Sequence, residues 1–249
     1  TDTLHLLLTR IKDTFRRFPG QFWLMFVGML FSSSGASMIW PFLLIYVSGK
    51  LDLPLSVVAR LITLNATTAL IASFIAGSIT DAFGRKWVMV VSLLADGLLF
   101  LTMMRAETYT AFAVLMVLRG IANPLFRVGA DAMLADLIPQ EKRVEAYGLA
   151  RMANNAGISI GPAVGGFLAA TSYSYAFIGA ASGMAIYGLL MAILGRETLT
   201  KHENPLPHAA ALKESLLGYW HALRDFPFIS AVGTMAFGWY ILDSRRKDE

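Results

Sequence analysis

The chain alternates long apolar runs with short polar segments. Residues 22–49 and 61–80 contain no charged side chain, and neither do the 44 residues from Met152 to Gly195. A helix needs about 20 residues to cross the hydrocarbon core of a bilayer, so the last run is long enough for two crossings. The strands of a membrane barrel would be shorter and would alternate apolar with polar positions. The pattern therefore predicts an all-α membrane protein, a multi-pass helical bundle.

Six membrane spans follow from the positions of the apolar runs. They are expected near residues 22–47, 57–80, 87–104, 109–134, 146–170 and 174–195. The sequence thus predicts a cytoplasmic N-terminal segment (1–21), a six-helix bundle (22–195), a cytoplasmic linker with an amphipathic helix (196–225) and a seventh hydrophobic segment (226–249). The last segment ends in basic residues, which would lie on the side of the membrane opposite to the other basic loops. Because this is against the charge bias of those loops, we interpret the end of the chain as truncated.

Composition supports the membrane assignment and excludes several other classes of protein. Hydrophobic residues make up 56% of the chain and charged residues 15%, and the mean hydropathy is +0.57. The chain has no cysteine, and its four histidines lie outside the predicted spans without metal-ligand spacing. It has no ATP-binding G-x-x-x-x-G-K loop and no basic tract suited to nucleic acid. We therefore expect a protein that is not an enzyme and needs no cofactor or metal.

Lysines and arginines in the short loops predict the orientation in the membrane. Ten lie on one side and three on the other: Arg10, Lys12, Arg16, Arg17, Arg85, Lys86, Lys142, Arg143, Arg196 and Lys201 against Lys50, Arg60 and Arg105. Basic loops stay in the cytoplasm, so the N-terminus is expected there, in a cell (inner or plasma) membrane.

Cysteine labelling tests this orientation. We expect cysteines placed at Ser48 and Ser172 to react with an impermeant reagent added outside, and cysteines at Thr14 and Gln140 to be protected. The reverse labelling pattern would invert the topology.

The segment "AGSITDAFGRKW", residues 76–87, places three charges between two spans. Gly84 can adopt a positive φ and so allow a tight reversal of the chain, and Arg85 and Lys86 fit a cytoplasmic turn. Asp81 follows the C-terminal end of a helix, where the helix dipole disfavours an acid, so it needs a compensating partner. Gly77, one turn earlier, would allow close approach of a neighbouring backbone.

This segment resembles the major facilitator superfamily signature G-x-L-x-D-R-x-G-R-K. Gly77, Asp81, Gly84, Arg85 and Lys86 match it, whereas isoleucine replaces the leucine and alanine the first arginine. The resemblance implies that the chain is the six-helix N-terminal half of a twelve-helix transporter. It also implies that this loop latches against the missing C-terminal half, and that Asp136 is the acid that pairs with Arg85.

A second segment, "GISIGPAVGG" at residues 157–166, resembles the G-x-x-x-G-P-x-x-G-G element of drug:proton antiporters in that superfamily. Small residues at four-residue spacing admit close helix packing, and proline can bend a helix. The resemblance implies that this helix contacts the missing half and restricts leakage; simple packing within the bundle is the alternative. The residues concerned are Gly157, Gly161, Pro162, Gly165 and Gly166.

The fourth span carries charges that are costly to insert into a bilayer. Arg119 lies near the middle of the membrane, and Asn123, Arg127 and Asp131 follow at steps of four, which makes a slowly winding polar stripe. The resemblance implies a role of Arg119 in proton coupling. Pairing of Arg127 with Asp131 one turn away is the alternative structural interpretation. Asp96 in the third span is not counted among the coupling residues, because a buried neutral acid bonded to Asn65 or Ser92 would give the same sequence pattern.

These features favour a secondary active transporter that works by alternating access. The expected partners are a small amphipathic substrate, protons as coupling ion, membrane lipid and the missing C-terminal half. A sugar or metabolite carrier of the same fold is one alternative, and a seven-helix receptor-like protein is an alternative of another class.

Overall fold

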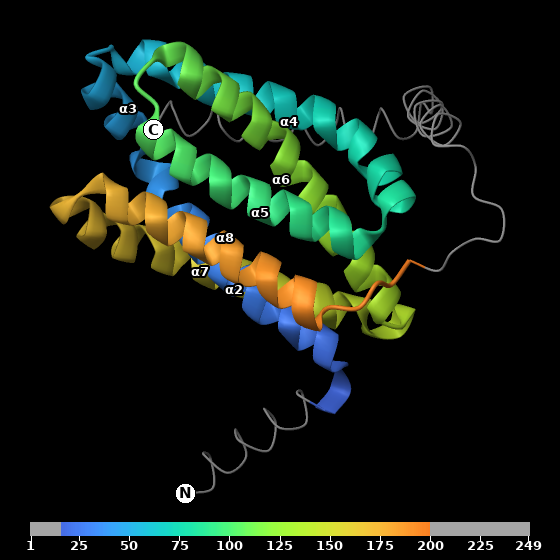
Figure 1. The fold of residues 1–249 in the computed structure, drawn as a ribbon. Coiled ribbons are helices and arrows are strands. Elements are labelled where there is room, and N and C mark those ends of the chain that lie inside the picture. Colours follow the sequence, from blue (N-terminus) through green and yellow to red (C-terminus); the bar gives the residue numbers. More distant parts are fainter. Residues whose placement is uncertain (1–15, 200–249) are drawn as a thin grey trace, which may run out of the picture. The chain divides into compact units, whose positions relative to one another are not determined.

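The computed structural model describes residues 16–199, and this part of the chain is helical without a strand (Figure 1). The chain divides into two compact units, 1–202 and 203–249, and the described residues belong to the first. The predicted linker helix and seventh hydrophobic segment lie outside the described residues. The helices are α2 Gly20–Ile39, α3 Leu43–Leu51, α4 Leu55–Phe83, α5 Arg85–Arg105, α6 Tyr109–Leu137, α7 Arg143–Thr171 and α8 Tyr173–Leu194, with 3-10 turns at Trp40–Phe42 and Gln140–Lys142.

The predicted helical bundle is confirmed, with one interruption that the hydropathy pattern did not show. The expected span at 22–47 consists of α2 and α3, separated by the turn Trp40–Phe42. Pro41 lies in this turn and has no N–H to donate to the preceding helical turn, which explains the break. Pro124 in α6 and Pro162 in α7 are instead accommodated within continuous helices.

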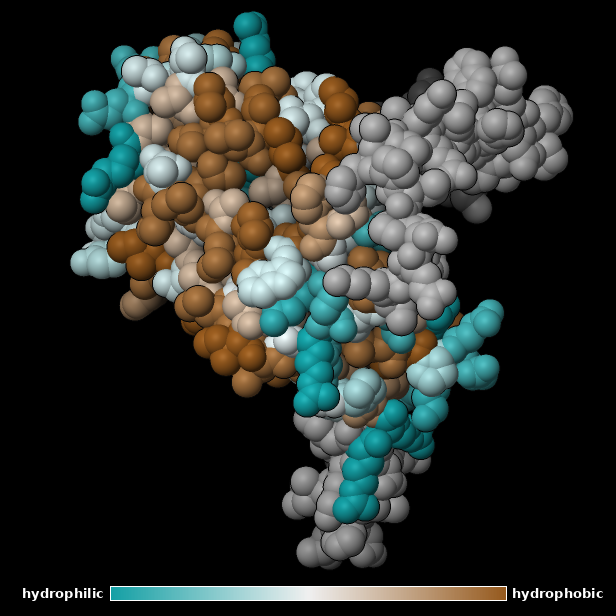
Figure 2. Space-filling model, turned by 45° about the vertical axis from the view of Figure 1, so that its right-hand side comes forward, coloured by the Kyte–Doolittle hydropathy of each residue, from teal (hydrophilic) through white to brown (hydrophobic). Residues whose placement is uncertain are grey.

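The outer surface of the bundle is apolar. Five stretches of the described chain are long and apolar enough to cross a membrane: 20–51, α4, α5, α6 and α8. α7 has 29 residues and carries Arg143, Glu145 and Arg151 toward its N-terminus. Large hydrophobic side chains such as Ile71, Leu98 and Phe167 are exposed, and Figure 2 shows hydrophobic side chains over much of the visible face. Such a continuous apolar surface is suited to lipid rather than to water.

The helices pack as two groups of three. α2 packs against α7 and α8, and α6 packs against α4 and α5; α5 and α8 join the two groups (Figure 1). Large buried side chains such as Phe22, Phe100 and Tyr187 fill the interior. This arrangement brings residues of α2, α4, α5, α6 and α7, with Met184 of α8, to a common cavity, described below.

The glycine stripe of α7 packs against α2. A Cβ atom added at Gly161 would lie 2.5 Å from the backbone oxygen of Ser34, and one at Gly165 would lie 2.5 Å from Cα of Met38. Gly157 faces α2 in the same way, with the backbone oxygen of Leu30 at 2.8 Å. The expected close packing is therefore present, but this face is used inside the six-helix unit. The glycine face is thus covered by α2, and contact of this helix with a second half stays a prediction.

The other glycines of the two sequence segments differ in their surroundings. A Cβ atom at Gly166 would lie 3.3 Å from the ring of Phe42, closer than an ordinary van der Waals contact, so the ring would have to shift slightly. At Gly77 no described atom lies within 4 Å of the added carbon. No backbone among residues 16–199 approaches Gly77 closely, and close approach of a neighbouring backbone there stays a prediction.

Candidate functional site

A cavity of about 960 Å³ lies between the helices. It extends from Trp40 and Arg119, in the middle of the bundle, to Arg143 and Val144 at the N-terminus of α7. Met29, Phe126, Ile158 and other apolar side chains supply much of its wall. The polar side chains that line it are Ser32, Ser33, Ser37, Asn65, Ser92, Asp96, Arg119, Asn123, Arg127, Asp131, Arg143, Tyr147, Arg151 and Asn154.

An ion pair between α5 and α6 lies at the inner end of the cavity. Nε of Arg119 is 3.0 Å from Oδ1 of Asp96, and the side chains are only 8% and 5% exposed. The Nε–H is not aligned for a good hydrogen bond, so the attraction is mainly ionic. Breaking such a buried pair by removing one partner typically costs about 3 to 5 kcal/mol, because the remaining charge stays uncompensated. Arg119 and Asp96 therefore each need the charge of the other to remain buried and ionised at this depth.

Aromatic rings hold the guanidinium of Arg119 in place. Its Cζ lies 4.4 Å from the ring centre of Trp40 and 4.6 Å from that of Phe100. The negative faces of aromatic rings attract cations, by about 2 kcal/mol where water is excluded. Arg119 thus keeps favourable contacts on two sides even when the charge of Asp96 changes.

Sequence reasoning predicted Arg119 but not its partner. Asn65 donates to the backbone oxygen of Met116 at 2.9 Å, and Asp96 pairs with Arg119 rather than with Asn65 or Ser92. In the described structure Arg127 and Asp131 form no close ion pair, although Arg127 acts electrostatically on Asp131. A helical stripe identifies residues on the same face of one helix, and it cannot reveal a partner on another helix.

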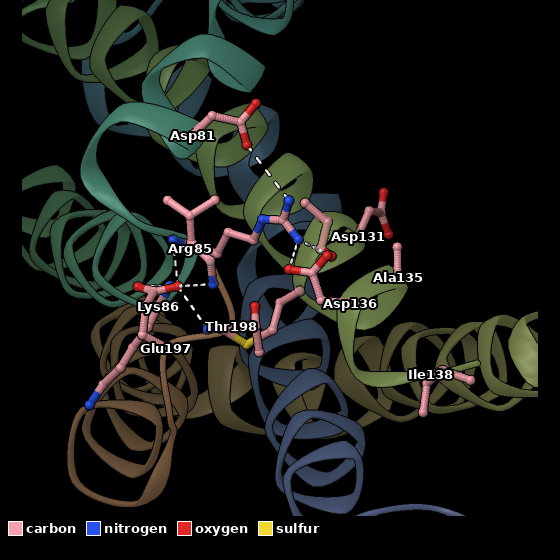
Figure 3. A network of polar contacts seen from close by, with 12 residues as sticks. Asp81, Arg85, Lys86, Asp131, Ala135, Asp136, Ile138, Glu197 and Thr198 are labelled. Carbon is pink, nitrogen blue, oxygen red and sulfur yellow. Dashed lines mark hydrogen bonds and ion pairs between the residues drawn. The ribbon is translucent and has the colours of Figure 1, made fainter. Parts of the chain in front are cut away.

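A second polar cluster surrounds Arg85 at the end of the bundle where α4 meets α5 (Figure 3). We call Asp81, Arg85, Asp136 and Glu197 the Arg85 network. The Nη1 atom of Arg85 binds Oδ2 of Asp136 on α6 and donates to the backbone oxygen of Ala132 at 2.8 Å. The guanidinium is thereby fixed on α6, as the resemblance implied for Asp136.

Asp81 is held only loosely in this network. Its Oδ1 lies 3.8 Å from Nη2 of Arg85, and its side chain is 64% exposed. An exposed pair at this distance contributes only about 0 to 1 kcal/mol to stability. Within the described residues, packing therefore does not explain an acid at this position.

Glu197 completes the network, and sequence reasoning missed it. Its carboxylate accepts hydrogen bonds from the backbone N–H groups of Arg85 and Lys86, at 3.0 and 3.1 Å, and so caps the N-terminus of α5. Gly84 precedes α5 with a φ of +91°, and a Cβ there would lie 2.5 Å from Oε2 of Glu197. Glycine at 84 thus allows both the turn and the cap. In the sequence, the one sign of this cap was that Gly84 has no side chain with which to cap α5 itself, so that another residue must do so.

Neither cluster is arranged as a metal site. Residues 16–199 contain no group of three or more histidine, cysteine, aspartate or glutamate side chains that could hold a metal ion. The polar groups that line the cavity can bind protons at carboxylates and can bind ligands through charged, amide and hydroxyl groups.

Comparison with known proteins agrees with this geometry of apolar spans around a polar cavity. Residues 25–244 match the family model described as Major Facilitator Superfamily, so the chain belongs to this superfamily. The relatives found are membrane transporters and not enzymes.

Three individual matches show the extent of the similarity. Multidrug resistance protein 1 of Bacillus subtilis (strain 168) is 30% identical, over 74% of this chain and 46% of its own length. A Na(+), Li(+), K(+)/H(+) antiporter of Planococcus maritimus is 27% identical, over 82% and 50%. A crystal structure of the peptide transporter POT in complex with alafosfalin has a TM-score of 0.63 at 21% identity, covering 90% of this chain and 50% of that one. The chain thus spans about half the length of these proteins.

Proposed function

We propose that this chain forms one half of a secondary active transporter that exports small amphipathic compounds in exchange for protons. The observation that carries the proposal is the buried ion pair of Arg119 and Asp96 at the inner end of the cavity. Ionisable groups in a membrane span are costly, and they commonly belong to substrate or proton pathways. The names of the multidrug resistance protein and the cation/proton antiporter support export coupled to protons.

Asp96 is the proposed proton carrier. Arginine keeps its proton at all accessible pH values, so only the carboxylate of the pair can take up and release one. Protonation of Asp96 removes the charge that holds Arg119, which then relies on Trp40 and Phe100. Binding of substrate and proton become linked if each favours a different state of this pair, and such linkage is reciprocal.

The second half of the transporter is proposed to face the open side of the cavity. In this fold the substrate site lies between two halves that rock against each other. The Arg85 network lies at the end that the loop charges assign to the cytoplasm. We propose that the loosely held Asp81 reaches its main partner on the second half and stabilises one closed state.

Transport by the full-length protein in proteoliposomes tests the proposal. Uptake of ethidium, tetracycline and a fluorescent quinolone is measured with a pH gradient imposed in either direction. We expect at least one compound to accumulate against its gradient when protons flow the other way, and collapse of the pH gradient by an ionophore to stop accumulation. Uptake of all three probes that does not respond to the pH gradient would contradict proton exchange.

The Asp81→Asn variant tests the proposed latch. It should change the stability of the protein by less than about 1 kcal/mol, because the contact with Arg85 is exposed and long. Transport should nevertheless fall roughly tenfold, the effect of losing a charge-assisted hydrogen bond that exists in only one closed state.

Asp52→Asn is the matched control for this variant. Asp52 is exposed in a left-handed turn after α3, a conformation that asparagine also adopts readily. It should leave transport unchanged. Wild-type transport by Asp81→Asn at normal protein levels would show that Asp81 is only a polar residue of the turn.

A further inference from the structure

The charges that line the cavity are unbalanced. Four arginines and two aspartates face it, a net charge of +2: Arg119, Arg127, Arg143, Arg151, Asp96 and Asp131. Arg119 and Asp96 neutralise each other at the inner end. Arg143 donates to the backbone oxygens of Ile138 and Ala135 at the end of α6. The positive charge that remains for a ligand is therefore concentrated on the outer part of the cavity.

Four arginines line the cavity, and Arg127 of α6 and Arg151 of α7 are the two whose guanidinium groups have no fixed partner among residues 16–199. Neither forms an ion pair or a side-chain hydrogen bond with any residue between 16 and 199. Both act electrostatically on Asp131, whose single charge cannot balance two cations. Both are exposed toward the cavity. Five donors in a planar fork remain available on each side chain.

Neighbouring acids do not supply the missing charge. Asp136 binds Arg85, and Glu145 lies 3.8 Å from Arg17. Asp136 is thus engaged with a cation outside the cavity, and Glu145 lies near one in an exposed and long pair. Arg127 and Arg151 together thus carry one more charge than Asp131 supplies.

From this arrangement we infer that the cavity selects amphipathic organic anions, in which an aromatic or aliphatic body carries a carboxylate. The guanidinium groups of Arg127 and Arg151 bind the carboxylate, since a guanidinium fork matches its two oxygens. Phe126, Met29 and Ile158 contact the apolar body. The inference rests on the proposed function, because it takes this cavity as the substrate site, and it adds the class of substrate.

Three probes that share one fluorophore test this inference on the full-length protein. Dansylglycine carries a carboxylate, dansylcadaverine an ammonium group, and dansylamide no charge. Fluorescence titrations of the purified transporter give the Kd of each. We expect dansylglycine to bind about tenfold more tightly than dansylcadaverine, as a charge-assisted, bidentate contact requires.

Variants assign the selectivity to the two arginines. Arg127→Gln with Arg151→Gln should abolish the preference for dansylglycine, while Arg60→Gln, an exposed position outside the cavity, should retain it. An unchanged Kd of dansylamide shows that the double variant is folded, and each single variant should lose part of the preference. Equal or tighter binding of dansylcadaverine, or a preference for dansylglycine that survives in the folded double variant, would overturn the inference.

The outcome separates this inference from the proposed function. A transporter that exchanges protons for cationic or neutral probes, without preference for anions, would leave proton-coupled export intact and refute the anion selectivity alone. Failure of all pH-driven transport, with the anion preference present, would refute the coupling alone.

Discussion

Transport driven by a pH gradient is expected to fall by about 100-fold or more in the Asp96→Asn variant, which corresponds to about 3 kcal/mol in a two-state equilibrium. Asparagine cannot carry a proton, and it leaves the charge of Arg119 buried without its partner. The same substitution should lower the free energy of unfolding by about 3 to 5 kcal/mol. Proteoliposome transport and thermal unfolding in detergent measure the two effects.

A double variant separates coupling from stability. Arg119→Gln together with Asp96→Asn removes both charges, and such neutral replacements of a buried pair recover much of the lost stability. Stability should therefore return, while proton-driven transport should not. Asp131→Asn, which changes an exposed acid that lines the same cavity, is the control and should retain proton-driven transport. Restored coupling in the double variant would exclude Asp96 as the proton carrier.

Valine in place of Gly161 is expected to prevent α7 from packing against α2. The Cβ atom of this valine would lie 2.5 Å from the backbone oxygen of Ser34 and 2.5 Å from the side chain of Ser37, both in α2. A backbone cannot move away locally as a side chain can, so the two helices must separate along their length. Overpacking of this kind costs about 3 kcal/mol or more. Most of the protein should therefore be lost from the monodisperse fraction in size-exclusion chromatography.

Gly148→Val on the same helix is the matched control. A Cβ at Gly148 would meet no described atom within 4 Å, and the change in helix propensity is the same as at Gly161. This variant should elute and unfold as the wild type does. A similar loss of monodisperse protein in the two variants would show that valine destabilises α7 itself, and that the contact with α2 is not the cause.

The helices could be predicted from the sequence because the bilayer imposes their length and apolar character. Hydropathy placed all six spans within a few residues of the observed helices. Hydropathy did not predict the turn at Pro41, because a proline in an apolar run can either break a helix or be accommodated in it, as Pro124 and Pro162 are. The choice depends on packing around each proline.

The candidate site could be predicted only in part because its contacts join distant segments. The cost of a charge in the membrane identified Arg119, but its partner Asp96 lies on a different helix. Spacing identified the small-residue face of α7, but not that α2 would cover it. Glu197 caps a helix whose first residue is 112 positions away in the chain. Such pairings arise from the fold and leave no periodic signal.

Proton release on substrate binding tests the central claim most directly. The compound that is transported best is added to the purified full-length protein in weakly buffered solution near neutral pH, and the pH change is recorded. The account predicts that the wild-type and Asp131→Asn proteins exchange a proton with the solution on binding, and that the double variant Asp96→Asn with Arg119→Gln binds the compound without exchanging one. The same proton exchange in the double variant as in the wild type would contradict it.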